Sequence, residues 1–175
     1  IVTISGPRSE TGSTRSVTFE NYYFNGIKVE GTKVVENMGL NANQNRVMKV
    51  TLTDGKLILP DGKIIEREME HQREFIAGAA TLNKWDDECL ITGTASGVNI
   101  NGVAYTNTIK TALHWKRACA FLVAGVIEIE RTGKESLELN YGEGECDANA
   151  TATMNGETRQ IILRHRHRLM NRQNN

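Results

Sequence analysis

The segment GVIEIERTGKESLELNY (residues 125–141) decides the fold class, because apolar and polar side chains alternate along both of its arms. In the first arm isoleucines alternate with glutamates, and in the second arm leucines alternate with polar residues. Alternation with a period of two is typical of β-strands that bury one face. The dipeptide Thr132-Gly133 separates the arms and predicts the turn of a β-hairpin.

The cysteines extend this hairpin toward its open end. Counting outward from the turn, Cys119 and Cys146 come within one residue of lying opposite each other, and one β-bulge would remove the offset. We therefore predict a Cys119–Cys146 disulfide and a free Cys89, which indicates an oxidising compartment. Three buried free thiols are the alternative. No C-x-x-C pair occurs, so the spacing does not favour a zinc site.

The composition of the chain favours β structure and one folded domain. Among the 175 residues, Thr, Asn and Gly are abundant and proline occurs only twice. Threonine favours strands, whereas asparagine and glycine favour turns. The 21 basic residues balance the 21 acidic residues, and this zero net charge excludes a dedicated nucleic-acid binder. No run of 18 apolar residues is present, which excludes a transmembrane helix.

Three segments share a pattern of β-branched residues between glycine turns, which indicates an internal repeat. GIKVEGTKVVEN (26–37) and GVNINGVAYTNT (97–108) match closely. DGKLILPDGKII (54–65) has the same glycine turns with a slightly longer insert. We expect two related halves, at about residues 17–91 and 92–163, each built from antiparallel hairpins.

The segment KIIEREMEHQRE (63–74) is rich in helix formers, but the repeat favours a strand with a charged outer face. In the repeat it takes the place equivalent to residues 103–114, which alternate like a strand. The predicted fold class is therefore all-β, with antiparallel hairpins in a sandwich or in an elongated twisted sheet. The side chains expected to form its core are Val17, Phe19, Tyr23, Val47, Leu57, Leu59, Ile91, Ile109, Trp115, Phe121, Ile127, Ile129, Leu137, Leu139, Ile161 and Leu163.

The two ends of the chain differ from the predicted single β domain, which covers residues 17–163. Residues 1–16 are polar and rich in turn formers, and we expect a linker or an extended edge strand at Ile1–Ile4. Residues 164–175 form a basic tail. No apolar segment typical of a signal peptide is present, so we expect a targeting segment to lie upstream of the first residue.

A resemblance to a group of bacterial proteins rests on the C-terminal half. Its most specific element is Tyr-Gly-x-Gly-x-Cys-Asp at residues 141–147, which follows Trp115-Lys116-Arg117 and the segment 123–128. Over about 70 residues the chain resembles uncharacterised secreted or lipid-anchored envelope proteins of Bacteroidota-type bacteria. The resemblance implies β structure and export to the periplasm, the outer-membrane surface or the medium. It implies membrane contact only through a lipid anchor upstream of Ile1, and it implies no activity.

An acidic run around the last cysteine suggests a cation site. Glu143, Glu145, Asp147 and Asn149 stand at every second position, and oxygen ligands of this kind can hold Ca²⁺. A strand, however, spreads alternate residues about 6.5 Å apart instead of converging them on one ion. A solvated strand edge whose charges block aggregation is the alternative. No other cofactor is expected.

Aromatic residues suggest a ligand surface. Tyr22, Tyr23, Trp85 and Trp115 are candidates for stacking on sugar rings. Because Tyr22 and Tyr23 are adjacent, one of them must face outward if the segment is a strand.

No catalytic constellation can be assembled from these residues, so we expect no enzyme. The expected function is that of a non-catalytic envelope protein, which presents a β surface for adhesion, for a glycan or for a protein partner. The alternatives are a Ca²⁺-stabilised structural module and an extracellular polysaccharide or peptide hydrolase. A hydrolase needs acids, or an acid and a histidine, that converge in a cleft. Its candidates are Asp86, Asp87, Glu143, Glu145, Asp147 and His114.

Overall fold

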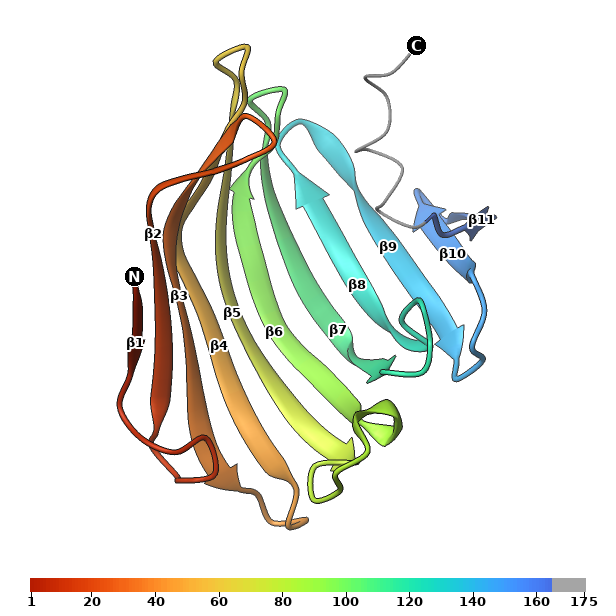
Figure 1. Ribbon diagram of the computed structural model, residues 1–175. Coiled ribbons are helices and arrows are strands. Elements are labelled where there is room, and N and C mark those ends of the chain that lie inside the picture. The colour runs from red at the N-terminus through yellow and green to blue at the C-terminus, as the bar shows by residue number, and fades with distance from the viewer. Residues whose placement is uncertain (165–175) are drawn as a thin grey trace.

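The computed structural model describes residues 1–164. These residues form one antiparallel β-sheet (Figure 1). The strands follow one another across the sheet in chain order, so that each pairs with its neighbours in sequence. A short 3₁₀ helix, η1 (Lys84–Asp86), precedes β6. The strands are β1 (Val2–Ile4), β2 (Thr14–Phe24), β3 (Ile27–Leu40), β4 (Arg46–Ile58), β5 (Ile64–Ala77), β6 (Glu88–Val98), β7 (Ala104–Lys116), β8 (Ala124–Arg131), β9 (Lys134–Glu143), β10 (Asn149–Met154) and β11 (Glu157–Ile162).

This arrangement confirms the all-β, antiparallel prediction in the form of an extended sheet. Residues 1–164 contain no second sheet that would make a sandwich. β1 and β11 form the two edges, so Val2–Ile4 is an edge strand. No helix of the described residues is long and apolar enough to cross a membrane. The predicted basic tail, except Arg164, lies outside the described residues.

The segment 125–141 forms the β8–β9 hairpin. Ile127 lies opposite Leu139, and Ile129 lies opposite Leu137, so the apolar residues share one face as predicted. The turn falls at Thr132-Gly133, between the paired ends of the two strands.

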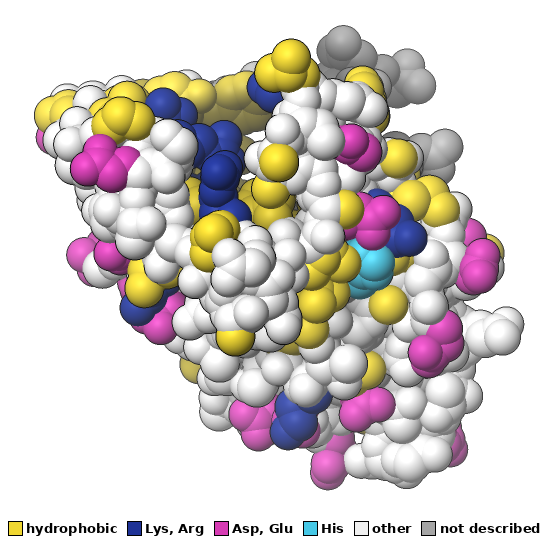
Figure 2. All heavy atoms as spheres, turned by 90° about the horizontal axis from the view of Figure 1, so that it is seen from below, with side chains coloured by type: hydrophobic (Ala, Val, Ile, Leu, Met, Phe, Trp, Pro, Cys, Tyr) yellow, Lys and Arg dark blue, Asp and Glu magenta, His cyan; other side chains and the backbone are white. Residues whose placement is uncertain are grey.

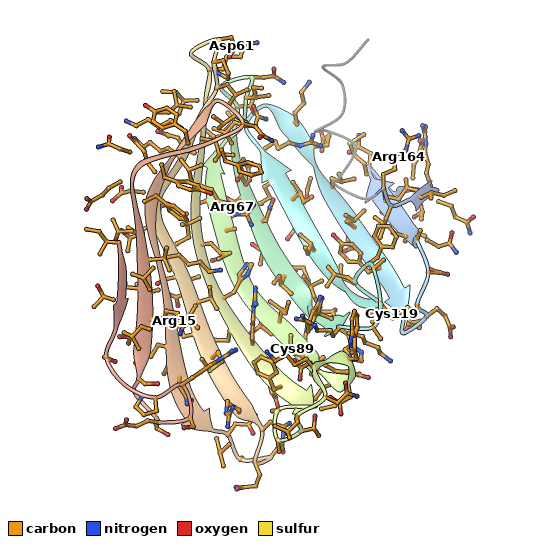
Figure 3. The ribbon with its side chains drawn as sticks, in the orientation of Figure 1. Arg15, Asp61, Arg67, Cys89, Cys119 and Arg164 are labelled. Atoms are coloured by element: carbon orange, nitrogen blue, oxygen red, sulfur yellow. A yellow bond between two sulfur atoms is a disulfide. The ribbon has the colours of Figure 1, made fainter. Side chains whose placement is uncertain are left out.

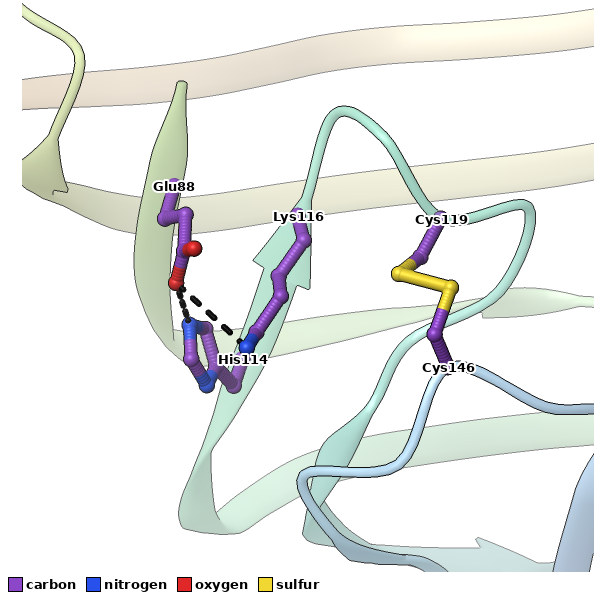
Figure 4. Close-up of a disulfide and its surroundings, with 5 residues drawn as sticks. All are labelled: Glu88, His114, Lys116, Cys119 and Cys146. Carbon is purple, nitrogen blue, oxygen red and sulfur yellow. Dashed lines mark hydrogen bonds and ion pairs between the residues drawn. A yellow bond between two sulfur atoms is a disulfide. The ribbon is translucent and has the colours of Figure 1, made fainter. Parts of the chain in front are cut away.

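A disulfide joins Cys119 to Cys146, and Cys89 is free and buried, as predicted. The hairpin itself ends before the cysteines, since Cys119 lies in the loop before β8 and Cys146 in the loop after β9. One backbone hydrogen bond, from Gly144 N–H to Val123 O at 2.8 Å, continues the pairing past the strands. The disulfide therefore ties together the two loops at the open end of the hairpin (Figure 4).

Two of the three segments that share the glycine pattern span hairpin turns in the structure, and the division into two related halves stays a prediction. Segments 54–65 and 97–108 each span a three-residue loop, which is closed by the backbone N–H of Leu59 and of Asn99, respectively. Segment 26–37 differs, because it continues along the single strand β3. Its second glycine stands at a register shift within that strand instead of in a turn. Spacing of glycines alone does not distinguish a turn from a strand bulge.

The sheet divides its side chains between two faces, and the central strand β5 shows the division. Its odd-numbered residues from Ile65 to Phe75 face one side, and its even-numbered residues, mostly glutamates, face the other. The strand predicted at 63–74, with a charged outer face, is thus confirmed. The sheet curves (Figure 1), and the loops that carry Arg8, Lys84 and Arg117 lie over the odd-numbered side of β5, where Arg73 is located. We call this side the concave face and the other side the convex face.

The most buried side chains of the central strands lie on the concave face. None of the residues expected to form the core is fully buried, and Tyr23 and Leu57 are exposed, so that expectation was wrong. A single sheet has no second layer to cover a strand, and only curvature and loops enclose side chains. The buried concave residues of β4, β6 and β7 are Met48, Val50, Cys89, Ala95 and Leu113.

Two strand glycines mark points where backbones approach very closely. Gly93 in β6 has a φ of +122°, and Gly125 in β8 has a φ of +105°. A Cβ atom would lie 2.1 Å from the carbonyl oxygen of Glu70 at the first position, and 2.5 Å from that of Ala112 at the second. Both positions therefore require glycine, for conformation and for space.

Candidate functional site

The concave face carries basic and apolar side chains together. Strand β5 contributes Arg67, His71 and Arg73, with Met69 and Phe75 on the same side. In strands β3 to β8 no carboxylate occupies a concave position. Figure 2 shows Lys and Arg side chains beside hydrophobic ones in the hollow of the molecule, and Figure 3 labels Arg67 on this face. Strands beside β5 and farther along the sheet add the basic residues Lys33, Arg46 and Arg131.

The convex face carries both lysines and glutamates, and several of its lysines form ion pairs. Lysines of one strand reach glutamates of the next, which are abundant on this side. The basic residues of the concave face named above form no ion pair with any described residue. The cross-strand pairs on the convex face include Lys49–Glu70 at 3.1 Å, Lys56–Glu66 at 3.3 Å and Lys110–Glu128 at 3.1 Å.

Two arginines of the concave face have buried donors without a partner. The Nε atoms of Arg73 and Arg131 are buried and make no hydrogen bond within the described part of the chain. The Oδ1 atom of Asn107, which lies on the same face, is also buried and accepts no hydrogen bond from the described residues. A buried donor without an acceptor costs about 1–3 kcal/mol. A ligand that brings acceptors to this face would recover that free energy.

A recess with a volume of about 290 Å³ gathers four basic residues at one end of the concave face. Arg73 comes from β5, Arg8 from the loop before β2, Lys84 from η1, and Arg117 from the loop after β7. Asp87 is the one acidic residue in the lining, which leaves an excess of three positive charges. The remaining wall is apolar and consists of Phe75, Cys89, Ile91 and Trp115.

Specific contacts hold the loops around this recess. The buried side chain of Asn37 donates from Nδ2 to the carbonyl oxygen of Arg8 at 2.9 Å. The backbone N–H of Arg117 donates to the carbonyl oxygen of Asp87, also at 2.9 Å. The guanidinium of Arg117 lies 6.0 Å from the ring centroid of Trp85, within the range of a cation–π interaction. The loop residues of the recess are therefore positioned by the fold.

The four aromatic residues predicted for a ligand surface do not form one cluster. Trp115 lines the recess, and Trp85 lies beside it with 70% of its surface exposed. Tyr22 and Tyr23, which are both exposed, lie at the opposite end of the sheet. Through the strand pairing, Tyr22 lies level with Ile65 of β5, and Trp115 lies level with Phe75. These two positions are ten residues apart along β5, which corresponds to roughly 33 Å. A single sugar ring cannot contact both groups.

The acidic run expected to hold Ca²⁺ is not one face of a strand. Glu143 ends β9, Glu145 and Asp147 lie in the loop on either side of Cys146, and Asn149 begins β10. The carboxylate of Asp147 accepts from the backbone and side-chain amides of Asn149, at 2.8 and 2.7 Å. The described residues contain no group of three or more His, Cys, Asp or Glu that could hold a metal ion. A Ca²⁺ site at these four residues stays a prediction.

The hydrolase candidates do not converge. His114 lies on the convex face, where its Nε2 is 2.7 Å from the carboxylate of Glu88, and Lys116 approaches the same carboxylate at 3.8 Å (Figure 4). Asp87 lines the recess of the concave face, and the adjacent Asp86 ends η1. The remaining candidates lie in or beside the loop between β9 and β10.

A pH dependence of stability follows from the position of His71. Burial lowers the pKa of His71 below its usual value of 6.5, and the neighbouring Arg67 and Arg73 lower it further. The folded protein therefore binds this proton less readily than the unfolded chain, and stability falls as the pH drops below about 6.5. We expect His71→Gln to lose less stability than the wild type between about pH 7.5 and pH 5.5. Urea unfolding at both pH values measures this difference, and equal losses would contradict it.

Comparison of the chain with protein-family models, with curated proteins and with solved structures found no match. The fold and the site define an open, single-layer antiparallel sheet with a basic and apolar concave face.

The arginines of the concave face were not among the residues predicted for a site. The signal for them is present in the segment 64–77, where glutamates alternate with arginine, methionine, histidine and phenylalanine. Alternation of acids with bases separates the two charges onto opposite faces of a strand. The alternation in this segment therefore predicts an acidic face and a basic face for β5.

Proposed function

We propose that this protein is a non-catalytic binding protein of the cell envelope or the extracellular medium, and that the concave face is its binding surface. The observation that carries the proposal is the separation of charge between the two faces of the sheet. Unpaired basic side chains stand among apolar ones on the concave side, whereas lysines and glutamates form pairs on the convex side. Arginine donors left unpaired gain free energy when a ligand supplies acceptors.

The disulfide supports the proposed compartment. The Cys119–Cys146 bond is consistent with an oxidising environment, in which disulfides form and persist. The resemblance of the C-terminal half to secreted or lipid-anchored envelope proteins agrees with it. We therefore extend the proposal to the periplasm, the outer-membrane surface or the medium.

A ligand screen on two charge-matched variants tests the proposal. Arg73→Gln with Arg131→Gln removes the two arginines whose buried Nε donors have no partner on the concave face, and Lys49→Gln with Lys110→Gln removes two charges from the convex face. Melting temperatures are measured with oligosaccharides, peptides and amphiphiles of different charge. We expect at least one ligand to raise the melting temperatures of the wild type and of the convex variant by similar amounts. The same ligand should raise the melting temperature of the concave variant much less.

Two results of this screen would contradict the proposal. One is that no ligand of any class shifts the melting temperature of the wild type. The other is that the convex variant loses the shift and the concave variant keeps it.

A further inference from the structure

The geometry points to the chemical class of the ligand, an amphiphile with one acyl chain and an anionic head. A long-chain fatty acid is the simplest member of this class. The inference rests on the proposed function, since it assigns a ligand to the same concave face. The head lies in the basic recess, and the acyl chain extends under the loop between β1 and β2.

The basic recess meets the requirements of an anionic head. Arg8, Arg73, Lys84 and Arg117 surround it, with Asp87 as the one opposing charge. Bonds between arginine and a carboxylate are charge-assisted and frequently bidentate. A carboxylate in the recess supplies an acceptor to the buried Nε of Arg73 and reduces the mutual repulsion of the cations.

A second recess provides space for the acyl chain. It has a volume of about 190 Å³ and shares one lining residue, Arg8, with the first recess. Its lining contains the apolar side chains of Ile4, Val35 and Met48, together with Gly6, Ser13, Thr14 and a second arginine, Arg15. The bond from Asn37 to the carbonyl oxygen of Arg8 holds the overlying loop in place. The two recesses together reach the lower part of the usual range of small-molecule sites, about 300–1,000 Å³.

The chemistry of the lining disfavours a ligand that has an anionic group without an apolar chain, or an apolar chain without an anionic group. Arginine and lysine side chains donate hydrogen bonds and accept none, so Asp87, Ser13 and Thr14 are the side-chain acceptors of the two recesses, whereas a neutral sugar needs both donors and acceptors. A small hydrophilic anion would satisfy the basic residues but would leave the apolar side chains of the second recess, Ile4, Val35 and Met48, without a partner. A molecule with an anionic head and an apolar chain satisfies both parts of the lining.

Displacement of a dansyl-labelled fatty acid, below the concentrations at which the competitors form micelles, tests the inference. Dodecanoate is expected to displace the probe. Dodecanol lacks the charge, and acetate and inorganic phosphate lack the chain. Each of these three is expected to displace the probe at least about tenfold less effectively.

Variants locate the head and the chain. Arg73→Gln and Arg117→Gln are each expected to weaken dodecanoate binding about tenfold, because each removes a charged donor. Ile4→Glu is also expected to weaken dodecanoate binding, because the substitution places a carboxylate beside the acyl chain. Ile4 is exposed on an edge strand, so we expect the fold to tolerate the substitution. Lys110→Gln, on the convex face, is the control and should keep the affinity within about twofold. Circular dichroism checks that every variant is folded.

The outcomes separate the inference from the proposed function. Equal displacement by dodecanol would overturn the anionic head, and equal displacement by phosphate would overturn the acyl chain. Unchanged affinity in both arginine variants would overturn the location. If an oligosaccharide or a peptide binds the concave face and dodecanoate does not, the inference fails while the proposed function stands. If no ligand of any class binds, both fail.

Discussion

Replacement of Gly93 by alanine is expected to destabilise the protein by at least about 3 kcal/mol, or to prevent folding. Gly93 has a φ of +122°, which side chains of L-residues rarely adopt. The new Cβ would also lie 2.1 Å from the carbonyl oxygen of Glu70 and 2.9 Å from the Cα of His71. Both are backbone atoms of the central strand, so neither can move without disturbing the sheet. Urea unfolding of the purified variant measures the loss.

Gly133→Ala is the matched control for this prediction. Gly133 also has a positive φ, of +70°, but a Cβ atom there would meet no other atom within 4 Å. Its cost should therefore be that of the left-handed conformation alone, about 1–2 kcal/mol. Equal losses in the two variants would show that β5 and β6 do not approach each other as closely at Gly93 as described.

Removal of the disulfide is expected to have the second large effect. Replacing both Cys119 and Cys146 by alanine should lower the free energy of unfolding by about 3–4 kcal/mol, because the closed loop spans 27 residues of chain. The wild type should show the same loss when it is reduced. Urea unfolding with and without a reductant measures both, together with a non-reduced peptide map that identifies the crosslink.

Cys89→Ala separates the effect of the disulfide from that of a buried thiol. Cys89 is free and buried, so its replacement should leave the dependence on reductant unchanged. A peptide map with a different cysteine pair would contradict the prediction, and so would stability that does not respond to reduction in the wild type.

Local patterns predicted the strands well, because strand alternation depends only on neighbouring residues. The β8–β9 hairpin and its register followed from the alternation around Thr132-Gly133. The pairing of Cys119 with Cys146 followed from the same register, although the strands end before the cysteines. The strand at 63–74 was predicted from the repeat and matches β5.

The core and the ligand face could not be predicted in this way, because both depend on how many layers the sheet has. Alternation shows that a strand has two different faces, but it does not show whether a second sheet covers one of them. With a single layer, Val47 is not buried and the neighbouring Met48 is. The basic recess also requires loops from distant parts of the chain, since it brings Arg8 beside Arg73 and Arg117. No local pattern contains that proximity.

The central claim is that the basic recess of the concave face binds an anionic amphiphile through its arginines, and side-chain NMR tests it most directly. Each arginine Nε–H gives its own signal in ¹⁵N-labelled protein, and dodecanoate is added stepwise. We expect the signals of Arg8, Arg73 and Arg117 to shift together and saturate, while the signal of Arg159, which is paired with Glu157 at the β11 edge, stays unchanged. The claim would be contradicted if the signals of the recess arginines did not respond to dodecanoate while arginine signals elsewhere did.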